Sequence, residues 1–373
     1  MSLKVTFFRN FLKDRRLSMD VYADSLRDAL CKYGAGRCNV KEYAPHLPHV
    51  LSYGIWSMRL ARYTVYPLQA RSHQTGINHI VDHGYGHLLY ALDPARTVVT
   101  VHDLIPLVRW RGGIAGVSRG RKPWLNLFSF HALRRAGHLI AISENTRHDL
   151  IQLCKCKPEN ITVVYYGFEE MFRPFNAIEG AAARREWNMP NDGTCRILIS
   201  GSGFYKNQIA ALQAFARLRM LYNGSLQLIK IGPLNSEWTE IVHKLGLTNV
   251  SKCITHVSYK EMPAILNSVE VVLFPSLYEG FGRPPLEAMA CGTPTIVSNA
   301  ASLPEVVGKD SVMYAPDDVN GLANGMLRIL TNSEIRDTVI ESGMARAEQF
   351  TLKRMAQQTL EIYERVAHNS RTS

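Results

Sequence analysis

Short apolar runs alternate along the chain with longer stretches whose apolar positions recur at helical spacing. Ser18–Tyr33 has this helical spacing, and Ser18 is placed to cap the helix start. Ser143 is placed to cap a later helix in the same way. The runs that predict strands in the first half are Leu3–Phe8, Asn78–Asp82, Thr97–Val101, His138–Ile142 and Ile161–Tyr165. Such alternation predicts a parallel sheet covered by helices.

The alternation starts again after a loop-like segment at Phe172–Asn176. The strands expected in this half are Arg196–Ser200, Leu226–Ile231, Val269–Phe274 and Thr295–Ser298, and the helices are Ile209–Leu221, Pro284–Ala290 and the terminal Thr351–Ala367. Two successive alternations predict an α/β protein of two doubly wound, Rossmann-like domains facing a central cleft. Ligands of such folds bind outside the carboxyl ends of the strands.

One stretch in the second half combines several features of an anion-binding site. Gly280 and Gly282 follow a buried strand and have no Cβ, so their backbone can approach a ligand closely. Pro284 suits the first turn of a helix, and the free N–H groups of that turn attract a diphosphate. Glu279 and Glu287 bracket the loop, and carboxylates accept hydrogen bonds from sugar hydroxyls. Alone, either glutamate would be an ordinary loop or helix residue.

The letters EGFGRPPLE, from Glu279 to Glu287, resemble the Glu-x7-Glu motif of family 4 of the retaining GT-B glycosyltransferases. The flanking FPSLYEGFG and LEAMACGTP are similar to that family as well. The resemblance implies that Glu279 contacts the donor sugar and that Glu287 binds the ribose hydroxyls. The letters YKN, from Tyr205 to Asn207, are similar to those of mannosyltransferases and related transferases of bacterial polysaccharide assembly.

Two further segments resemble the same family. Gly201–Asn207 looks like its donor-phosphate loop, in which Lys206 would neutralise the leaving diphosphate, and Val101–Leu107 looks like its histidine motif, which places His102 at the donor sugar. The implied catalytic residues are His102, Lys206 and Glu279. The implied donor-binding residues are Gly201, Ser202, Gly203, Lys206, Glu279, Gly280, Phe281, Gly282, Arg283 and Glu287.

The phosphate loop departs from the family pattern at one position. Many members have an arginine where this chain has Ser202, so one cation is missing from its usual place. Arg283 either replaces it or points to solvent. In the first half, Asp82, His83 and Tyr85 follow a predicted strand and either line the acceptor side or belong to a structural loop.

The resemblance also implies the division of the chain. We expect an acceptor-binding domain at 1–173, to which the terminal helix at 355–373 returns, and a nucleotide-sugar-binding domain at 174–354. The predicted activity is the retaining transfer of a sugar from a donor such as GDP-mannose or a UDP-sugar to a glycan or lipid-linked glycan, in cell-surface polysaccharide synthesis. No cofactor is expected, and no metal, because no Asp-x-Asp pair lies in a suitable loop.

Charge is distributed unequally between the two halves. Residues 1–175 contain 24 basic and 13 acidic residues, whereas residues 176–373 contain 19 of each. The excess either keeps the protein soluble or binds an anionic partner such as a membrane leaflet or a lipid-linked phosphate. Trp110 and Trp124 lie beside basic residues, as at membrane interfaces.

The composition of the chain indicates the cellular compartment in which the protein is expected. Seven scattered cysteines, without a CxxC pair, favour a reducing cytoplasm over a disulfide framework. No apolar stretch approaches the roughly 20 residues of a spanning helix, and no secretory signal is evident at the N-terminus. We therefore expect a cytoplasmic protein that is peripheral on the membrane if its basic half binds lipid. The oligomeric state is not predicted.

Two other functions are compatible with parts of the sequence. A sugar-nucleotide epimerase could use the same architecture, and a product assay distinguishes it because only transfer needs an acceptor. A protein that binds nucleic acid through its basic half is the other alternative. Against it, the chain has no recognisable nucleic-acid module, and its most specific motif lies in the neutral half.

Overall fold

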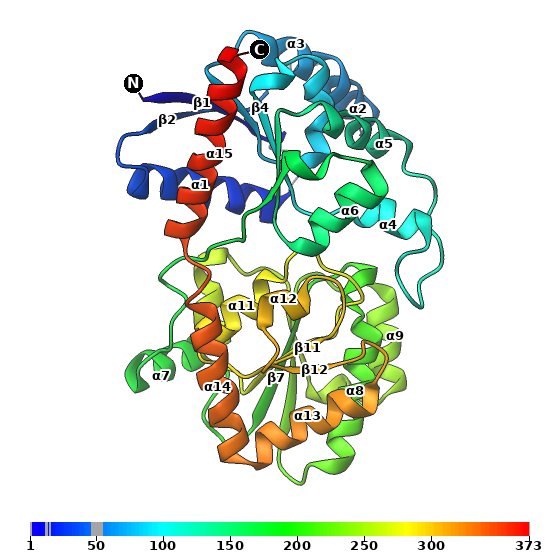
Figure 1. The fold of residues 1–373 in the computed structure, drawn as a ribbon. Helices are drawn as coiled ribbons and strands as arrows, with labels where there is room; N and C mark the ends of the chain where they lie inside the picture. The colour runs from blue at the N-terminus through cyan, green and yellow to red at the C-terminus, as the bar shows by residue number, and fades with distance from the viewer. Residues whose placement is uncertain (1, 12–13, 15, 46–54, 373) are drawn as a thin grey trace. The chain divides into compact units, whose positions relative to one another are not determined.

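The computed structural model describes residues 2–11, 14, 16–45 and 55–372. It divides into two compact units, one formed by residues 1–168 together with 350–373 and the other by residues 169–349. Figure 1 shows the two units and the labels used below. The predicted boundary after Arg173 lies five residues beyond this division. Each unit has its own parallel sheet and is described separately.

The first unit is built on a six-stranded parallel sheet. Its strand order is β2-β1-β3-β4-β5-β6. The strands are β1 (Leu3–Phe8), β2 (Cys38–Tyr43), β3 (Ile77–Ile80), β4 (Thr97–Val101), β5 (His138–Ala141) and β6 (Ile161–Val163). Every residue of the central strands β3, β4 and β5 is buried, as expected of a parallel sheet covered by helices on both faces.

The helices of the first unit include the C-terminal helix. They are α1 (Leu17–Tyr33), α2 (Ile55–Tyr63), α3 (Val65–Arg71), α4 (Ile105–Arg111), α5 (Trp124–Ala132), α6 (Glu144–Cys154), α15 (Leu352–Thr372) and the 3-10 helix η3 (His83–Tyr90). Figure 1 shows α15, in red, alongside α1, against which it packs. The Tyr363 hydroxyl lies 2.6 Å from Nδ1 of His79 in β3, which fastens α15 to the sheet.

The second unit repeats the architecture with a sheet of order β12-β11-β10-β7-β8-β9, again parallel. The strands are β7 (Cys195–Ser200), β8 (Leu226–Ile231), β9 (Ser251–Ile254), β10 (Val271–Phe274), β11 (Thr295–Ser298) and β12 (Val312–Tyr314). The helices are α7 (Ala177–Glu186), α8 (Gln208–Leu221), α9 (Ser236–Lys244), α10 (Met262–Leu266), α11 (Arg283–Ala290), α12 (Leu303–Val307), α13 (Val319–Thr331) and α14 (Ser333–Ala347).

Alternate residues of each strand in the second unit face opposite layers. Ile197 and Ile199 of β7 belong to a core that also contains Phe215 of α8 and Met326 of α13. Leu198 lies between them and is just as buried, which places it on the other face. Both faces of the sheet are therefore covered, and its strand ends are left to form a site.

Most predicted elements are present, and two local predictions can be compared directly with the structure. Ser143 caps α6, since its hydroxyl oxygen accepts a hydrogen bond of 3.0 Å from the Thr146 amide. The prediction for Ser18 was wrong, because α1 already begins at Leu17 and its cap residue is Arg16. In the described part of the chain, no helix has the length and hydrophobicity that a membrane span requires.

Candidate active site

The loop that follows β7, Gly201–Asn207, packs against the side chain of Lys206. Gly201 has a φ of +86°, and a Cβ at this position would lie 2.9 Å from Cε of Lys206. Glycine is therefore required here, both by the backbone angle and by the packing of the lysine stem. Asn207 ends the loop in the left-handed region and donates hydrogen bonds to the carbonyls of Pro275 and Pro316, at 2.9 and 2.7 Å. The loop is thereby joined to the one that follows β10.

The end of this loop brings together two of the predicted catalytic residues. Lys206 Nζ lies 2.8 Å from Oε1 of Glu279, and the two side chains are only 14% and 10% exposed. Ser302 fixes the carboxylate's own loop, since its hydroxyl lies 2.9 Å from the Glu279 carbonyl and 2.8 Å from the Phe281 carbonyl. A cation and a carboxylate are thus held at the carboxyl edge of the sheet, where parallel folds bind ligands.

Helix α11 begins immediately after that loop. Its cap residue Gly282 has a φ of +108°, and a Cβ there would lie 2.7 Å from Cδ2 of Leu303. Two prolines follow Arg283 in the first turn, where amide groups lack intrahelical partners. The helix ends at Ala290, and Gly292 then adopts a left-handed conformation with a φ of +71°. The prediction of a glycine-bounded helix start at this position is confirmed.

The predicted ribose ligand Glu287 is buried on α11. Its Oε1 lies 2.5 Å from Nε of Arg283, one helical turn earlier. Burial raises the pKa of Glu287, and the charge of Arg283 opposes that rise. Because Arg283 is engaged in this ion pair, it does not point to solvent. Its assignment as a diphosphate ligand stays a prediction.

Two residues beside this pair were missed by the sequence analysis. The guanidinium of Arg283 lies 4.1 Å from the ring centroid of Tyr259 and 3.7 Å from Oε2 of Glu169. The Tyr259 hydroxyl donates a hydrogen bond to Glu169, and burial raises the pKa of this tyrosine above its usual range. Glu169 and Tyr259 are 90 residues apart and belong to no motif, so only the fold brings them together.

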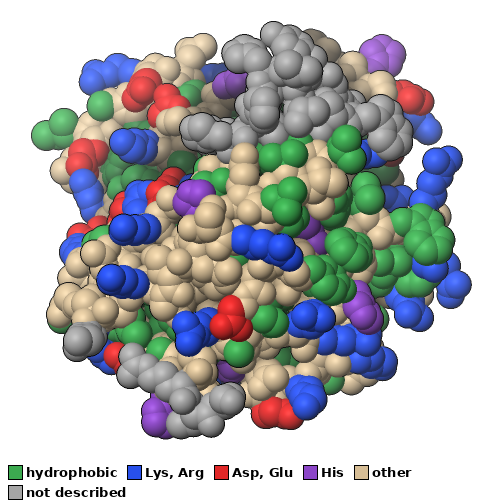
Figure 2. Space-filling model, turned by 90° about the horizontal axis from the view of Figure 1, so that it is seen from above, with side chains coloured by type: hydrophobic (Ala, Val, Ile, Leu, Met, Phe, Trp, Pro, Cys, Tyr) green, Lys and Arg blue, Asp and Glu red, His purple; other side chains and the backbone are tan. Residues whose placement is uncertain are grey.

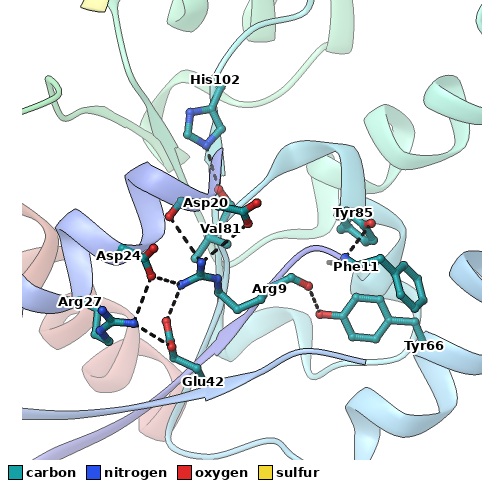
Figure 3. Close-up of polar contacts among 10 residues, drawn as sticks. All are labelled: Arg9, Phe11, Asp20, Asp24, Arg27, Glu42, Tyr66, Val81, Tyr85 and His102. Carbon is teal, nitrogen blue, oxygen red and sulfur yellow. Dashed lines mark hydrogen bonds and ion pairs between the residues drawn. The ribbon is translucent and has the colours of Figure 1, made fainter. Parts of the chain in front are cut away.

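In the first unit, His102 follows β4 and is 4% exposed. Its Nε2 lies 2.8 Å from the Val81 carbonyl, as Figure 3 shows. A carbonyl only accepts hydrogen bonds, so Nε2 carries the proton and Nδ1 is left as the acceptor. Burial lowers the pKa of His102, which keeps the ring neutral at pH 7. The edge of the Tyr22 ring packs on it with centroids 4.8 Å apart.

Three residues of the segment that follows β3, namely Asp82, His83 and Tyr85, support this histidine and the loop after β1. Asp82 is fully buried and its Oδ2 lies 2.8 Å from Nη1 of Arg16. Burial alone raises the pKa of Asp82, but the charge of Arg16 and a hydrogen bond from the Gly84 amide outweigh it and hold that pKa below its usual range. His83 accepts a 3.2 Å hydrogen bond from the His102 amide, and Tyr85 accepts one of 3.1 Å from the Phe11 amide. These contacts give Asp82, His83 and Tyr85 structural roles in the loop.

Figure 3 also shows a network of ion pairs around Arg9, directly after β1. Arg9 Nη1 lies 2.8 Å from Oδ1 of Asp24 in α1 and 2.6 Å from Oε1 of Glu42 in β2. Arg27 pairs with the same two carboxylates. The Arg9 carbonyl accepts a 2.6 Å hydrogen bond from the Tyr66 hydroxyl. The network joins α1, β1 and β2 at the carboxyl end of β1.

The remaining predicted residues lie within the loops already described. Ser202 is exposed and Gly203 precedes the turn of Phe204–Lys206, whereas Phe281 is buried. Gly280 lies between Glu279 and Phe281 in the loop fixed by Ser302. Among the residues that the structure describes, no cluster of three or more His, Cys, Asp or Glu side chains could hold a metal ion.

Two family models match the chain, one in each unit. "Glycosyltransferase Family 4" matches residues 8–170 and "Glycosyl transferases group 1" matches residues 183–346. The chain is 32% identical over 283 residues to an MMP alpha-(1->4)-mannosyltransferase of Mycolicibacterium hassiacum, covering 72% of this chain and 65% of the relative. It is 26% identical over 284 residues to the serotype-specific mannosyltransferase WbdA of Escherichia coli, covering 74% of this chain and 34% of that protein.

Solved structures resemble the whole fold. The structure of HepE from Anabaena, in complex with UDP and glucose, superposes with a TM-score of 0.75 at 18% identity. The match covers 97% of this chain and 99% of that one. It supports the predicted GT-B architecture of two Rossmann-like units, each with the parallel sheet described above.

Proposed function

This chain belongs to the glycosyltransferases of the family 4 type, and on that premise we propose that it transfers a sugar from a nucleoside-diphosphate donor to a glycan or lipid-linked glycan. We further propose that the transfer retains the configuration at the anomeric carbon and takes place in polysaccharide assembly. The chain spans only 65% and 34% of the length of these two relatives.

The observation that carries this proposal is the pair formed by Lys206 and Glu279. Their 2.8 Å contact is held between a glycine loop and the start of α11, a place where N–H groups attract an anion. A bound diphosphate would compete with Glu279 for Lys206 and release the carboxylate to accept a hydrogen bond from a sugar hydroxyl. One pair of residues would thus recognise both parts of the donor.

The same groups would assist the chemical step. Negative charge builds on the diphosphate as its bond to the sugar breaks, and Lys206 is placed to meet it. Glu287 would bind the ribose, held in position by Arg283 at 2.5 Å. His102 is proposed to contact the transferred sugar, with neutral Nδ1 as a hydrogen-bond acceptor.

Mannose is the sugar that we propose, because both curated relatives named above are mannosyltransferases. The guanine nucleotide GDP-mannose is therefore the first donor to test, and UDP-sugars are the second, since HepE was solved with UDP. A thermal-shift screen of GDP, UDP, ADP and TDP identifies the base, because a ligand that binds only the folded state stabilises it. No stabilisation by any of the four would contradict the proposal.

We also propose that the first unit binds an anionic membrane surface. Between Asp103 and Glu144 the sequence contains no acidic residue and seven basic ones. In α5, Trp124 is 70%, Leu125 45% and Phe128 49% exposed, and the Lys122 ammonium lies 3.8 Å from the Trp124 ring centroid. On the face shown in Figure 2, hydrophobic side chains gather toward the right of the view with Lys and Arg side chains beside them, and other basic side chains are spread over the rest of the face. Exposed aromatic rings beside cations suit a lipid headgroup region.

A further inference from the structure

A second lysine lies beneath the loop of Lys206, and no motif includes it. Lys230, in β8, is completely buried. Its Nζ donates hydrogen bonds to the carbonyls of Gly201 and Ile231, at 2.6 and 2.9 Å. The Gln208 side chain donates to the same Gly201 carbonyl. The glycine that opens the phosphate loop is therefore fixed from below by Lys230 while Lys206 packs on it from the loop.

The charge of Lys230 has no counterpart among the described residues. Both acceptors of its ammonium are neutral carbonyls, and no carboxylate of the described chain lies within ion-pair distance. The groups that face it are the Trp238 indole of α9, with its ring centroid 5.6 Å from Nζ, and the Cys253 thiol of β9. Burying a charge without a partner is costly, by several kcal/mol in proteins. A ligand that brings negative charge to this position would offset that cost.

The position of Lys230 indicates where that ligand would lie. Lys230 is next to last in β8, and Gly201 and Gly232 follow the ends of the neighbouring strands β7 and β8. Both glycines have positive φ, and a Cβ on Gly232 would lie 3.6 Å from Lys230 Nζ and 3.9 Å from the Gly201 amide nitrogen. The strand ends above the ammonium are thus free of side chains at both positions. Within the loop Gly201–Asn207, Lys206 is the only cationic residue.

We propose that Lys230 is a second cation of the donor site, which holds the phosphate loop through Gly201 and whose charge is balanced by the diphosphate of the bound nucleotide. The inference rests on the proposed function, because it assigns the ligand as a nucleoside diphosphate. Lys230 acts through the loop and through its field, so it is a positioning residue. It would supply part of the positive charge that is missing at Ser202.

A rise in pH can remove the charge of Lys230 without breaking its hydrogen bonds. Burial lowers the pKa of Lys230 to about 8, while Cys253 opposes that shift. Burial raises the pKa of the Cys253 thiol. A neutral amine still has two N–H groups for the two carbonyls. Deprotonation above pH 8 therefore removes the charge and leaves the loop contacts in place.

The test is calorimetric titration with the nucleoside diphosphate that the wild-type protein binds and with the corresponding uncharged nucleoside. Lys230→Met should weaken diphosphate binding at least tenfold at pH 7 and change nucleoside binding less than twofold. Lys252→Met is the matched control, because Lys252 lies on the neighbouring strand β9 and also donates to two carbonyls, those of Trp187 and Asn188. It should leave both affinities within twofold.

The pH series provides a measurement that a purely structural role would not change. Wild-type affinity for the diphosphate should fall several-fold between pH 7.5 and 9, Cys253→Ser should show the same fall, and Lys230→Met should show none. The melting temperature of Lys230→Met without ligand should be equal to or above that of the wild type, because an unpaired buried charge is removed. If Lys230→Met does not fold, the pH series of the wild type and of Cys253→Ser still tests the inference. A fall in diphosphate affinity in both supports it, and no fall in the wild type overturns it.

Three outcomes would overturn the inference. Unchanged diphosphate affinity in Lys230→Met, with the wild type binding normally, would remove Lys230 from the site and leave the proposed function standing. Equal losses for diphosphate and nucleoside, without a pH effect, would show a structural role only. Failure of the wild type to bind any nucleoside diphosphate would overturn the proposed function and this inference together.

Discussion

The two glutamates of the proposed donor site have different electrostatic surroundings. Glu279 is paired with Lys206 at 2.8 Å, and Glu287 with Arg283 at 2.5 Å in a more buried position. Burial raises the pKa of Glu287, so its ionised form depends on the arginine. We therefore expect replacement of Glu279 and replacement of Glu287 to change ligand binding differently.

Replacement of Glu287 by alanine should mainly weaken nucleotide binding. A hydrogen bond from a ribose hydroxyl to a charged group contributes about 1.5–3 kcal/mol, which corresponds to roughly 10- to 150-fold in affinity. Calorimetric titration with the preferred nucleoside diphosphate measures the change. Glu305→Ala, on α12 in the same unit, is a suitable control. Wild-type affinity in Glu287→Ala would remove the ribose assignment.

Replacement of Lys206 by alanine should instead reduce turnover. In the proposed mechanism this lysine meets charge that develops in the transition state, and loss of one such group typically costs about 10²- to 10³-fold in kcat. Steady-state rates at saturating donor, compared with Lys206→Arg, separate charge from position. A normal kcat with a raised KM would show that Lys206 contributes to ground-state binding alone.

Among the elements, the start of α11 depends on local sequence, and the sequence predicted it well. Its glycines, prolines and two acids lie within nine residues, so spacing alone locates the turn and the helix. Strand β2 was missed because it lies at the sheet edge and half of its positions are exposed. The start of α1 was misplaced by one residue: Arg16 occupies the cap position without a side-chain cap, and its side chain contacts Asp82, 66 residues away.

Within the candidate site, too, local sequence predicts some features, and contacts between distant segments determine others. Lys206 and Glu279 each belong to a recognisable motif, and the contact between them was found only in the structure. The contacts of Arg283 with Tyr259 and Glu169, and of Lys230 with Gly201, join segments that have no motif in common. Long-range polar contacts of this kind depend on how the strands are ordered in the sheet. They could not be predicted from spacing along the chain.

Replacement of Gly282 by alanine should disrupt the start of α11. The residue has a φ of +108°, and the new Cβ would lie 2.7 Å from Leu303. Strain in this conformation costs about 1–3 kcal/mol, so both stability and nucleotide affinity should fall. Gly180→Ala, in α7 where nothing lies within 4 Å of the new Cβ, is the control and should stabilise by about 0.5–1 kcal/mol. Equal melting temperatures for the two variants would contradict this account.

Across the whole molecule, buried histidines are concentrated in the first unit. Burial lowers the pKa of His79 and His83 to about 3, and that of His87 and His138 to about 4. None of these histidines can gain a proton readily without unfolding. In the described part of the second unit, no histidine is among the buried residues.

Stability of the first unit should therefore decrease as the pH falls below about 6.5. In the unfolded chain these histidines bind protons near pH 6.5, whereas in the folded unit they stay neutral down to about pH 4. The free energy of unfolding should drop by up to about 1.4 kcal/mol per histidine for each pH unit in this window. Hydrogen exchange at pH 7.5 and 5.5 measures the two units separately. Equal loss of protection in both would contradict the prediction.

Because basic residues are in excess in the first half of the chain, we expect the protein to bind anionic membranes. Co-sedimentation with vesicles should rise with anionic lipid content and fall with salt, because the Debye length is about 10 Å at 0.1 M. Replacing Arg109, Arg111, Arg119, Arg121 and Lys122 by Gln should weaken binding and leave nucleotide affinity unchanged. The control replaces exposed basic residues of the second unit, namely Arg217, Arg219, Lys244, Lys260 and Lys309. Equal binding to neutral and anionic vesicles would assign the charge to solubility.

The central claim is that this protein transfers a sugar from a nucleotide donor with retention and without a metal. The most direct measurement is proton NMR of the product formed from GDP-mannose, and from UDP-sugars in parallel, with a glycan acceptor in excess chelator. The account predicts a new glycosidic bond with the anomeric configuration of the donor and an unchanged rate in chelator. An inverted linkage, or transfer that stops in chelator and resumes with Mg²⁺ or Mn²⁺, would contradict it.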